Sequence, residues 1–117
     1  MSIQGVFYVS AHVSDLTRSK QFYSEKLGWK LGTDQPEVAG FHFGSGYLVL
    51  LADAAHAKFA GGMHVAIRVN DIDAEYRRLV EAGVAVSELR RQPWGERNFS
   101  FHDPDGYEWS YGEIESA

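Results

Sequence analysis

Hydrophobic and polar positions predict the same order of elements in both halves of the chain. In the first half, residues 6–13 are rich in β-branched and aromatic side chains, as is typical of a strand. A helix is expected directly afterwards, capped by Ser14 or Asp15 and ended by Gly28. Its apolar positions are Leu16, Phe22, Tyr23 and Leu27. Three short strands then follow, at residues 29–33, 40–43 and 47–51.

The second half repeats this order. Its first strand is expected from Met63, and a helix over residues 70–82 follows and ends at Gly83. One face of this helix is apolar because of the 3.6-residue period, and it carries Ile72, Tyr76, Leu79 and Val80. The remaining strands are expected at residues 85–89, 99–102 and 107–111. An Asp-Pro-Asp-Gly sequence at residues 103–106 supplies the turn before the last strand.

The two halves are related as an internal duplication. Residues 9–16 align with residues 65–72, 56 positions later, with two matching valines and a matching aspartate. The Gly-Tyr pair at residues 46–47 recurs at residues 106–107, 60 positions later. A duplication of this kind predicts a single α+β domain built from two tandem βαβββ modules. The predicted modules are residues 1–57 and 58–117.

Composition and charge narrow the range of partners. Of the 117 residues, 44% are hydrophobic and none is cysteine, which favours a compact core and excludes a disulfide framework. The net charge of -5 disfavours binding to nucleic acid or to an anionic membrane. No apolar run approaches the ~18 residues of a membrane span, and no signal pattern opens the chain, so a cytoplasmic location is expected. The basic cluster of Arg90, Arg91 and Arg97 is interpreted as a solvated face rather than as a site for an acidic ligand tail.

Several motifs in their order and spacing resemble one superfamily. The first helix carries Ser-Lys-Gln-Phe-Tyr at residues 19–23 and runs to Leu-Gly-Trp at residues 27–29, and the Asp-Pro-Asp-Gly turn precedes the last strand. With the Val-x-Asp motif after each opening strand, the chain resembles the vicinal oxygen chelate superfamily. That group includes glyoxalase I, extradiol dioxygenases, fosfomycin-resistance transferases and bleomycin-resistance proteins. The resemblance implies a curved, mostly antiparallel sheet around a cleft, and a homodimer.

The resemblance also marks four positions at which enzymes of the superfamily hold a divalent metal ion. In this sequence they are Tyr8 and His64 on the first strand of each module, and Leu50 and Ser110 on the last strand. Only His64 is a good ligand, because serine and neutral tyrosine are poor donors and leucine has no donor atom. We therefore predict no cofactor, and His64 is the one metal candidate among these positions.

Strand alternation indicates which side chains face the cleft, because successive side chains point to opposite faces. The cleft-facing residues are Tyr8, Ser10 and His12 in the first module, and His64, Ala66 and Arg68 in the second. A guanidinium at an inward-facing position needs a partner. For Arg68 this partner is either Glu108 or an acidic group of the ligand.

A Pro-Trp-Gly loop supplies the best aromatic ligand contact, Trp94. This loop resembles that of the bleomycin-resistance branch, and the resemblance implies that a flat, often cationic antibiotic is bound by stacking without a reaction. Trp109 and Tyr111 alternate away from Ser110 and are expected to pack under the helix, and Trp29 is expected in the core. The predicted ligand-binding residues are Tyr8, His12, His64, Arg68, Trp94, Phe101, Glu108 and Ser110.

Two functions from different classes remain open. The first is a metal-free protein that binds a small aromatic or antibiotic-like molecule in the cleft between the modules. The second is a metal-dependent lyase, isomerase, transferase or dioxygenase, in which a divalent ion polarises vicinal oxygens. The second function requires a rearranged ligand set, for which His12, His64 and Glu108 are the candidates. The loss of the usual metal positions favours the first.

Overall fold

The chain divides into two compact units, Met1–Phe59 and Ala60–Ala117. The computed structural model describes residues 2–58, 60 and 64–115. The predicted start of the second module at Met63 lies outside these residues, and the organisation as a single domain stays a prediction. None of the helices in the described ranges is long and apolar enough to cross a membrane.

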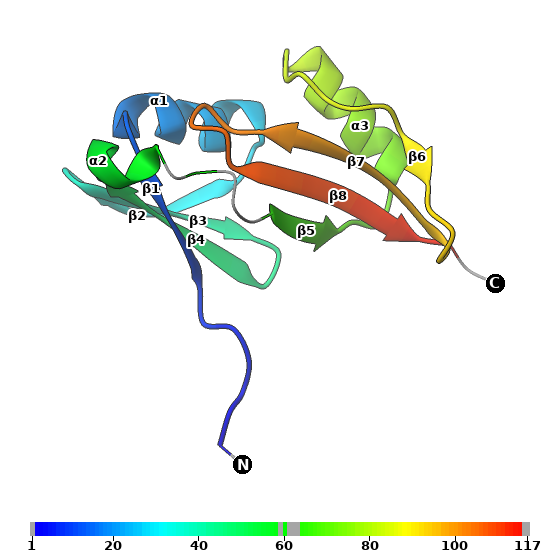
Figure 1. Cartoon of the computed structure of the whole chain (residues 1–117), viewed down its shortest axis with the longest axis horizontal. Helices are drawn as coiled ribbons and strands as arrows, with labels where there is room; N and C mark the ends of the chain where they lie inside the picture. The colour runs from blue at the N-terminus through cyan, green and yellow to red at the C-terminus, as the bar shows by residue number, and fades with distance from the viewer. Residues whose placement is uncertain (1, 59, 61–63, 116–117) are drawn as a thin grey trace. The chain divides into compact units, whose positions relative to one another are not determined.

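The first unit contains one four-stranded sheet in the order β1-β4-β3-β2 (Figure 1). Its elements are β1 (Val9–Val13), α1 (Leu16–Gln21), a π-helical turn (Phe22–Lys26), β2 (Lys30–Gln35), β3 (Val38–Phe43), β4 (Gly46–Ala52) and α2 (Ala54–Ala57). β1 runs parallel to β4, and the other two pairs are antiparallel. Helix α1 contacts β3 and β4.

The second unit repeats this topology with the strand order β5-β8-β7-β6. Its elements are β5 (His64–Arg68), α3 (Ile72–Glu81), β6 (Arg90–Arg91), β7 (Glu96–His102) and β8 (Glu108–Ile114). β5 runs parallel to β8, the other pairs are antiparallel, and α3 contacts β7 and β8. The predicted α+β class, with two βαβββ repeats and mostly antiparallel strands, is confirmed.

Both long helices begin at an aspartate and end at a glycine. Asp15 and Asp71 each accept a hydrogen bond from the backbone N–H three residues later, at 3.1 Å. The second helix was expected from Asn70, but the cap is Asp71, because its carboxylate reaches that N–H group. Gly28 and Gly83, with φ angles of 73° and 81°, end the helices as predicted, in a conformation that other residues rarely adopt.

The strand expected at residues 85–89 is reduced to a single bridge between Val86 and Phe101. The side chain of Ser87 explains why no ladder continues there. Its Oγ accepts the backbone N–H of Ser100 at 2.9 Å, so a side chain takes the place of the carbonyl that a strand would offer. Regular pairing resumes only at β6.

Aromatic side chains fill the core of each unit. In the first unit, Tyr23 is fully buried, with its ring centroid 5.2 Å from that of Trp29 and 5.7 Å from that of Phe41. In the second unit, Trp109 and Tyr111 are buried on the α3 side of the sheet. The core placement predicted for Trp29, Trp109 and Tyr111 is therefore confirmed.

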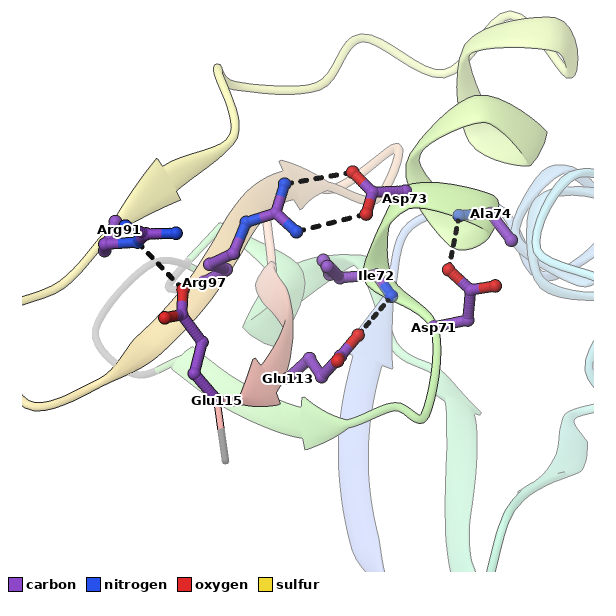
Figure 2. Close-up of polar contacts among 8 residues, drawn as sticks. All are labelled: Asp71, Ile72, Asp73, Ala74, Arg91, Arg97, Glu113 and Glu115. Carbon is purple, nitrogen blue, oxygen red and sulfur yellow. Dashed lines mark hydrogen bonds and ion pairs between the residues drawn. The ribbon is translucent and has the colours of Figure 1, made fainter. Parts of the chain in front are cut away.

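Arg91 and Arg97 pair with carboxylates in the second unit, as Figure 2 shows. Arg97 binds both carboxylate oxygens of Asp73 in α3, at 2.9 and 3.1 Å. Arg91 donates to Glu115 at 2.8 Å. Arg90 and Arg91 are exposed to solvent, as expected, but strand alternation separates Arg90 from the other two, so the three arginines do not form one cluster.

The pair between Asp73 and Arg97 makes stability depend on pH in the acidic range. The side-chain hydrogen bonds from Arg97 lower the pKa of Asp73. The contribution of this ion pair to the free energy of unfolding is therefore complete above the pKa of an unfolded aspartate, about 3.9. It is lost as the pH falls through the lower pKa of Asp73 in the folded protein. We expect the Asp73→Asn variant to have a lower urea midpoint than the wild type at pH 6, and this difference to shrink as the pH is lowered below about 4. A difference that persists unchanged at the lower pH would contradict this assignment.

Candidate functional site

The sheet of the second unit has an apolar face and a polar face. The apolar face carries Phe99, Phe101, Trp109 and Tyr111, which are buried. Alternation places polar side chains on the opposite face, which contains a hollow of about 160 Å³. We call this the polar hollow; it is lined by His64, Ser87, Arg90, Gln92, Asn98, Phe99, Ser100, Glu108 and Ser110.

Strand register brings the lining residues together from four segments of the chain. His64 on β5 lies opposite Glu108 on β8, and Ser110 lies opposite Ser100 on β7. Arg90 on β6 lies opposite the next lining residue of β7, Asn98. Because these positions belong to hydrogen-bonded ladders, their backbones are fixed by the sheet rather than by a loop.

Hydrogen bonds orient the amide and hydroxyl groups at the rim of the polar hollow. The Gln92 side chain donates to Oδ1 of Asn98 at 3.0 Å, and Oγ of Ser87 accepts the backbone N–H of Ser100. Such contacts hold polar groups in place before a ligand arrives, which reduces the entropy lost on binding.

The polar hollow contains groups of opposite charge. Arg90 supplies a permanently charged guanidinium with five N–H donors, and Glu108 supplies a carboxylate. His102 lies on the same face, with Nε2 3.9 Å from the Glu108 carboxylate. The site can therefore hydrogen-bond a ligand that presents both acceptor and donor groups. His64, Glu108 and Ser110 are the predicted ligand-binding residues that line it.

Of the two partners considered for Arg68, the strand register excludes Glu108. In the parallel ladder of β5 and β8, Arg68 lies opposite Gly112, whereas Glu108 lies opposite His64. The two side chains share a face but stand four residues apart along the strands, or roughly 13 Å. Arg68 is exposed at the far end of the polar face and is not a lining residue of the polar hollow.

Two predicted aromatic contacts have different environments. Trp94 is 66% exposed in the turn between β6 and β7, where its indole N–H donates to Glu96 at 2.8 Å. Phe101 is 1% exposed, and its ring centroid lies 5.2 Å from that of Tyr111 in the core. Alternation from Ser100 turns Phe101 away from the polar face, so the structure gives no support to its predicted ligand contact.

The predicted residues of the first unit are not among the residues that line the polar hollow. Tyr8 directly precedes β1, and half of its surface is exposed. The strand expected over residues 6–13 begins only at Val9. His12 lies at the end of β1, with Nδ1 3.4 Å from the carboxylate of Asp53.

The register also corrects the equivalence between the last strands of the modules. Ser110 lies opposite Ala66, and the counterpart of Ala66 in the first unit is Ser10. The residue opposite Ser10 is Val49, so Val49 and not Leu50 corresponds to Ser110. The turn between β7 and β8 is one residue longer than the turn between β3 and β4. Equivalent residues of the two units are therefore 60 positions apart before the turn and 61 positions apart after it. Leu50 is fully buried in the core.

The superfamily's metal positions do not fit a divalent ion in this chain. With the corrected register they are Tyr8, Val49, His64 and Ser110. An imidazole, a phenol, a hydroxyl and an aliphatic side chain provide one good ligand, whereas catalytic sites use at least three protein ligands. Valine, like leucine, has no donor atom, and the absence of a cofactor stays a prediction.

Six lining residues of the polar hollow were not predicted as site residues from the sequence: Phe99 and the polar residues Ser87, Arg90, Gln92, Asn98 and Ser100. Strand alternation could have identified three of them. Once Ser110 is placed on the polar face, the hairpin with β7 puts Ser100 and Asn98 there, and pairing with β6 adds Arg90. Ser87 and Gln92 follow no strand period, so the sequence carried no signal for them.

Comparisons with known proteins agree with this fold. The chain is 32% identical, over 98% of its length and 99% of the other chain, to the crystal structure of TnmS3, an antibiotic binding protein from Streptomyces sp. CB03234, with a TM-score of 0.84. It is 18% identical to lactoylglutathione lyase from Agrobacterium tumefaciens, over 97% of this chain and 96% of that one, with a TM-score of 0.80. The second likeness concerns the fold alone.

The sequence comparisons point to the same family. An uncharacterized protein of Mycobacterium bovis is 41% identical over 56 residues, which are 45% of this chain and 37% of that protein. The matched region thus spans about a third of the length of that curated relative. The profile of the Glyoxalase/Bleomycin resistance protein/Dioxygenase superfamily matches residues 5–111. The chain therefore belongs to the Glyoxalase/Bleomycin resistance protein/Dioxygenase superfamily.

Proposed function

We propose that this protein binds a small antibiotic-like molecule through the polar hollow, without a metal ion at the superfamily's usual positions. The observation that carries the proposal is the convergence of Arg90, Asn98, Ser100, Glu108 and Ser110 on one face of a rigid sheet. The full-length likeness to an antibiotic binding protein supports it, because that relative is 32% identical.

The size of the polar hollow limits what it contacts. Its volume is about 160 Å³, whereas sites for drug-sized ligands usually measure about 300–1,000 Å³. It therefore suits a polar group of the ligand, which Arg90 and the neighbouring amides would orient. Trp94, in the turn that follows Gln92, is proposed to stack on an aromatic part of the same ligand. The cleft between the modules, the homodimer and the cytoplasmic location stay predictions, and the proposal does not depend on them.

A matched pair of arginine variants tests the proposal. Arg90 lines the polar hollow, whereas its neighbour Arg91 pairs with Glu115. Bleomycin and a series of planar antibiotics would be titrated into the wild type and both variants by calorimetry. We expect Arg90→Ala to weaken binding by about tenfold or more, the usual worth of a hydrogen bond to a charged group, and Arg91→Ala to leave it unchanged.

Two outcomes would count against the proposal. One is that no compound of the series binds the wild-type protein with saturable heat. The other is that Arg90→Ala and Arg91→Ala weaken binding equally, which would indicate a general charge effect. Trp94→Ala provides a further check on the stacking contact. Aromatic pairs contribute about 0.5–1.5 kcal/mol beyond their buried area, so the loss of the indole is expected to weaken binding by at least this much.

A metal-dependent enzyme is the alternative function, and one observation favours it. Of the three candidate ligands His12, His64 and Glu108, the last two lie opposite each other and line the polar hollow. Elemental analysis of protein purified without chelator tests this alternative. Stoichiometric metal that is lost in His64→Ala would favour the enzyme over the metal-free binder.

A further inference from the structure

The first unit contains a cluster of donor atoms that the proposed function does not use. His12 lies at the end of β1, Asp53 follows β4, and His56 lies in α2. One ligand atom from each of these residues lies within 4.8 Å of the other two. Two imidazoles and a carboxylate are the ligand types of many zinc sites.

Regular elements bring these three side chains together. β1 and β4 run parallel, so their carboxyl ends lie at the same edge of the sheet. The backbone N–H of Asp53 donates to the carbonyl of Val13 at 3.0 Å, which ties the residue after β4 to the end of β1. Asp53 then caps α2, and His56 follows three residues later on the adjacent turn.

The two oxygens of Asp53 have separate roles. Oδ1 accepts the backbone N–H of His56 at 3.3 Å and caps the helix. Oδ2 faces both imidazoles, at 2.6 Å from Nδ1 of His56 and 3.4 Å from Nδ1 of His12. The side-chain hydrogen bond from His56 lowers the pKa of Asp53. Oδ2 is thus oriented toward the ring nitrogens of both histidines.

We propose that His12, Asp53 and His56 form a binding site for a divalent transition-metal ion such as Zn²⁺. Ligands of a tetrahedral zinc ion with bonds of about 2.0–2.1 Å lie roughly 3.4 Å apart. The distance from His12 to Asp53 already has this value. The distance from His56 to Asp53 must lengthen by about 0.8 Å, which a rotation of the exposed His56 side chain would provide.

This site differs from the position at which enzymes of the superfamily hold their metal. None of its three residues occupies one of the positions Tyr8, Val49, His64 or Ser110. With three protein ligands and partly exposed side chains, it leaves room for solvent as a fourth ligand. It shares no residue with the polar hollow, because all three ligands belong to the first unit.

Calorimetric titration of the metal-free protein with ZnCl₂ tests the site. We expect one Zn²⁺ per chain, bound at least about tenfold more weakly by His12→Gln, Asp53→Asn and His56→Gln. Asparagine is a good helix cap, so Asp53→Asn removes the charge while the cap of α2 is kept. The controls are His42→Gln, an exposed histidine of the same unit, and His64→Gln, the superfamily's position.

Thermal melting of each metal-free variant separates a lost ligand from a lost fold. Unchanged melting with weakened Zn²⁺ binding in the three ligand variants, and wild-type binding in both controls, supports the site. No saturable binding, or equal binding in all variants, overturns it. Loss of binding in His64→Gln alone also overturns it, because the ion would then lie at the superfamily's position.

Discussion

The Phe99→Ala variant is expected to lose about 3–5 kcal/mol of unfolding free energy. Phe99 is 1% exposed and lies at the centre of the aromatic core of the second unit. Its ring centroid is 5.1 Å from that of Tyr76 in α3 and 5.6 Å from that of Tyr111 in β8. Removing the ring leaves a cavity between helix and sheet, and the remaining aromatic side chains cannot collapse into it without losing their edge-to-face contacts.

Urea denaturation of the wild type and the variant measures this loss. A typical domain has only about 5–15 kcal/mol of stability, so the milder Phe99→Leu variant should be measured as well in case the alanine variant does not fold. Trp94→Ala is the matched control, because this aromatic ring is 66% exposed, and its loss is expected to change stability by less than about 0.5 kcal/mol. An equal loss in both variants would contradict the assigned core.

The Gly40→Ala variant is expected to lose about 1–3 kcal/mol. The ring of Tyr47 lies directly on the backbone of Gly40: an added Cβ would lie 2.5 Å from Cζ and 2.6 Å from Cε2. The ring is held there by its hydroxyl, which accepts the N–H of Thr33 at 2.8 Å and hydrogen-bonds to Oγ1 of the same residue at 2.7 Å. A methyl group at position 40 therefore displaces the ring and breaks these bonds.

A double-mutant cycle isolates this contact. In the Tyr47→Ala background the ring is absent, so Gly40→Ala is expected to be neutral or slightly stabilising, because alanine loses less conformational entropy than glycine. The measurement is the difference in urea-derived unfolding free energy between the two backgrounds. If the substitution is equally costly in both, the ring of Tyr47 is not the cause.

The fold could be predicted from the sequence because its signals are local. Apolar positions such as Leu27 and Leu79 follow the helical period, and both side chains are buried. The glycines that end the helices, Gly28 and Gly83, have the positive φ angles that favour this residue. These signals are the same in both halves of the chain, so each supports the other.

The candidate site was predicted less completely because it depends on strand register. A register shift of one residue moves every side chain of a strand to the opposite face. Because the turn of the second unit has one extra residue, the counterpart of Ser110 is Val49 rather than Leu50. Phe101 was assigned to the ligand for a similar reason: its face is fixed by pairing with Trp109, which the sequence does not specify.

Contacts between residues far apart in the chain could not be predicted from the sequence, for a different reason. His12 and Asp53 are 41 positions apart, and they meet only because β1 and β4 are parallel neighbours. The spacing of Asp53 and His56 is that of a helix cap and the third residue after it, a local signal that was present. Alternation along β1 placed His12 on a face but could not name its partner.

The central claim is that a ligand binds at the polar hollow, and amide chemical-shift mapping tests it most directly. ¹⁵N-labelled protein would be titrated with bleomycin and with the planar antibiotic that binds most tightly in calorimetry. We expect the largest saturable shifts at Ser87, Arg90, Asn98, Ser100 and Ser110. Shifts confined to other residues, or no saturable shift with any compound, would contradict the claim.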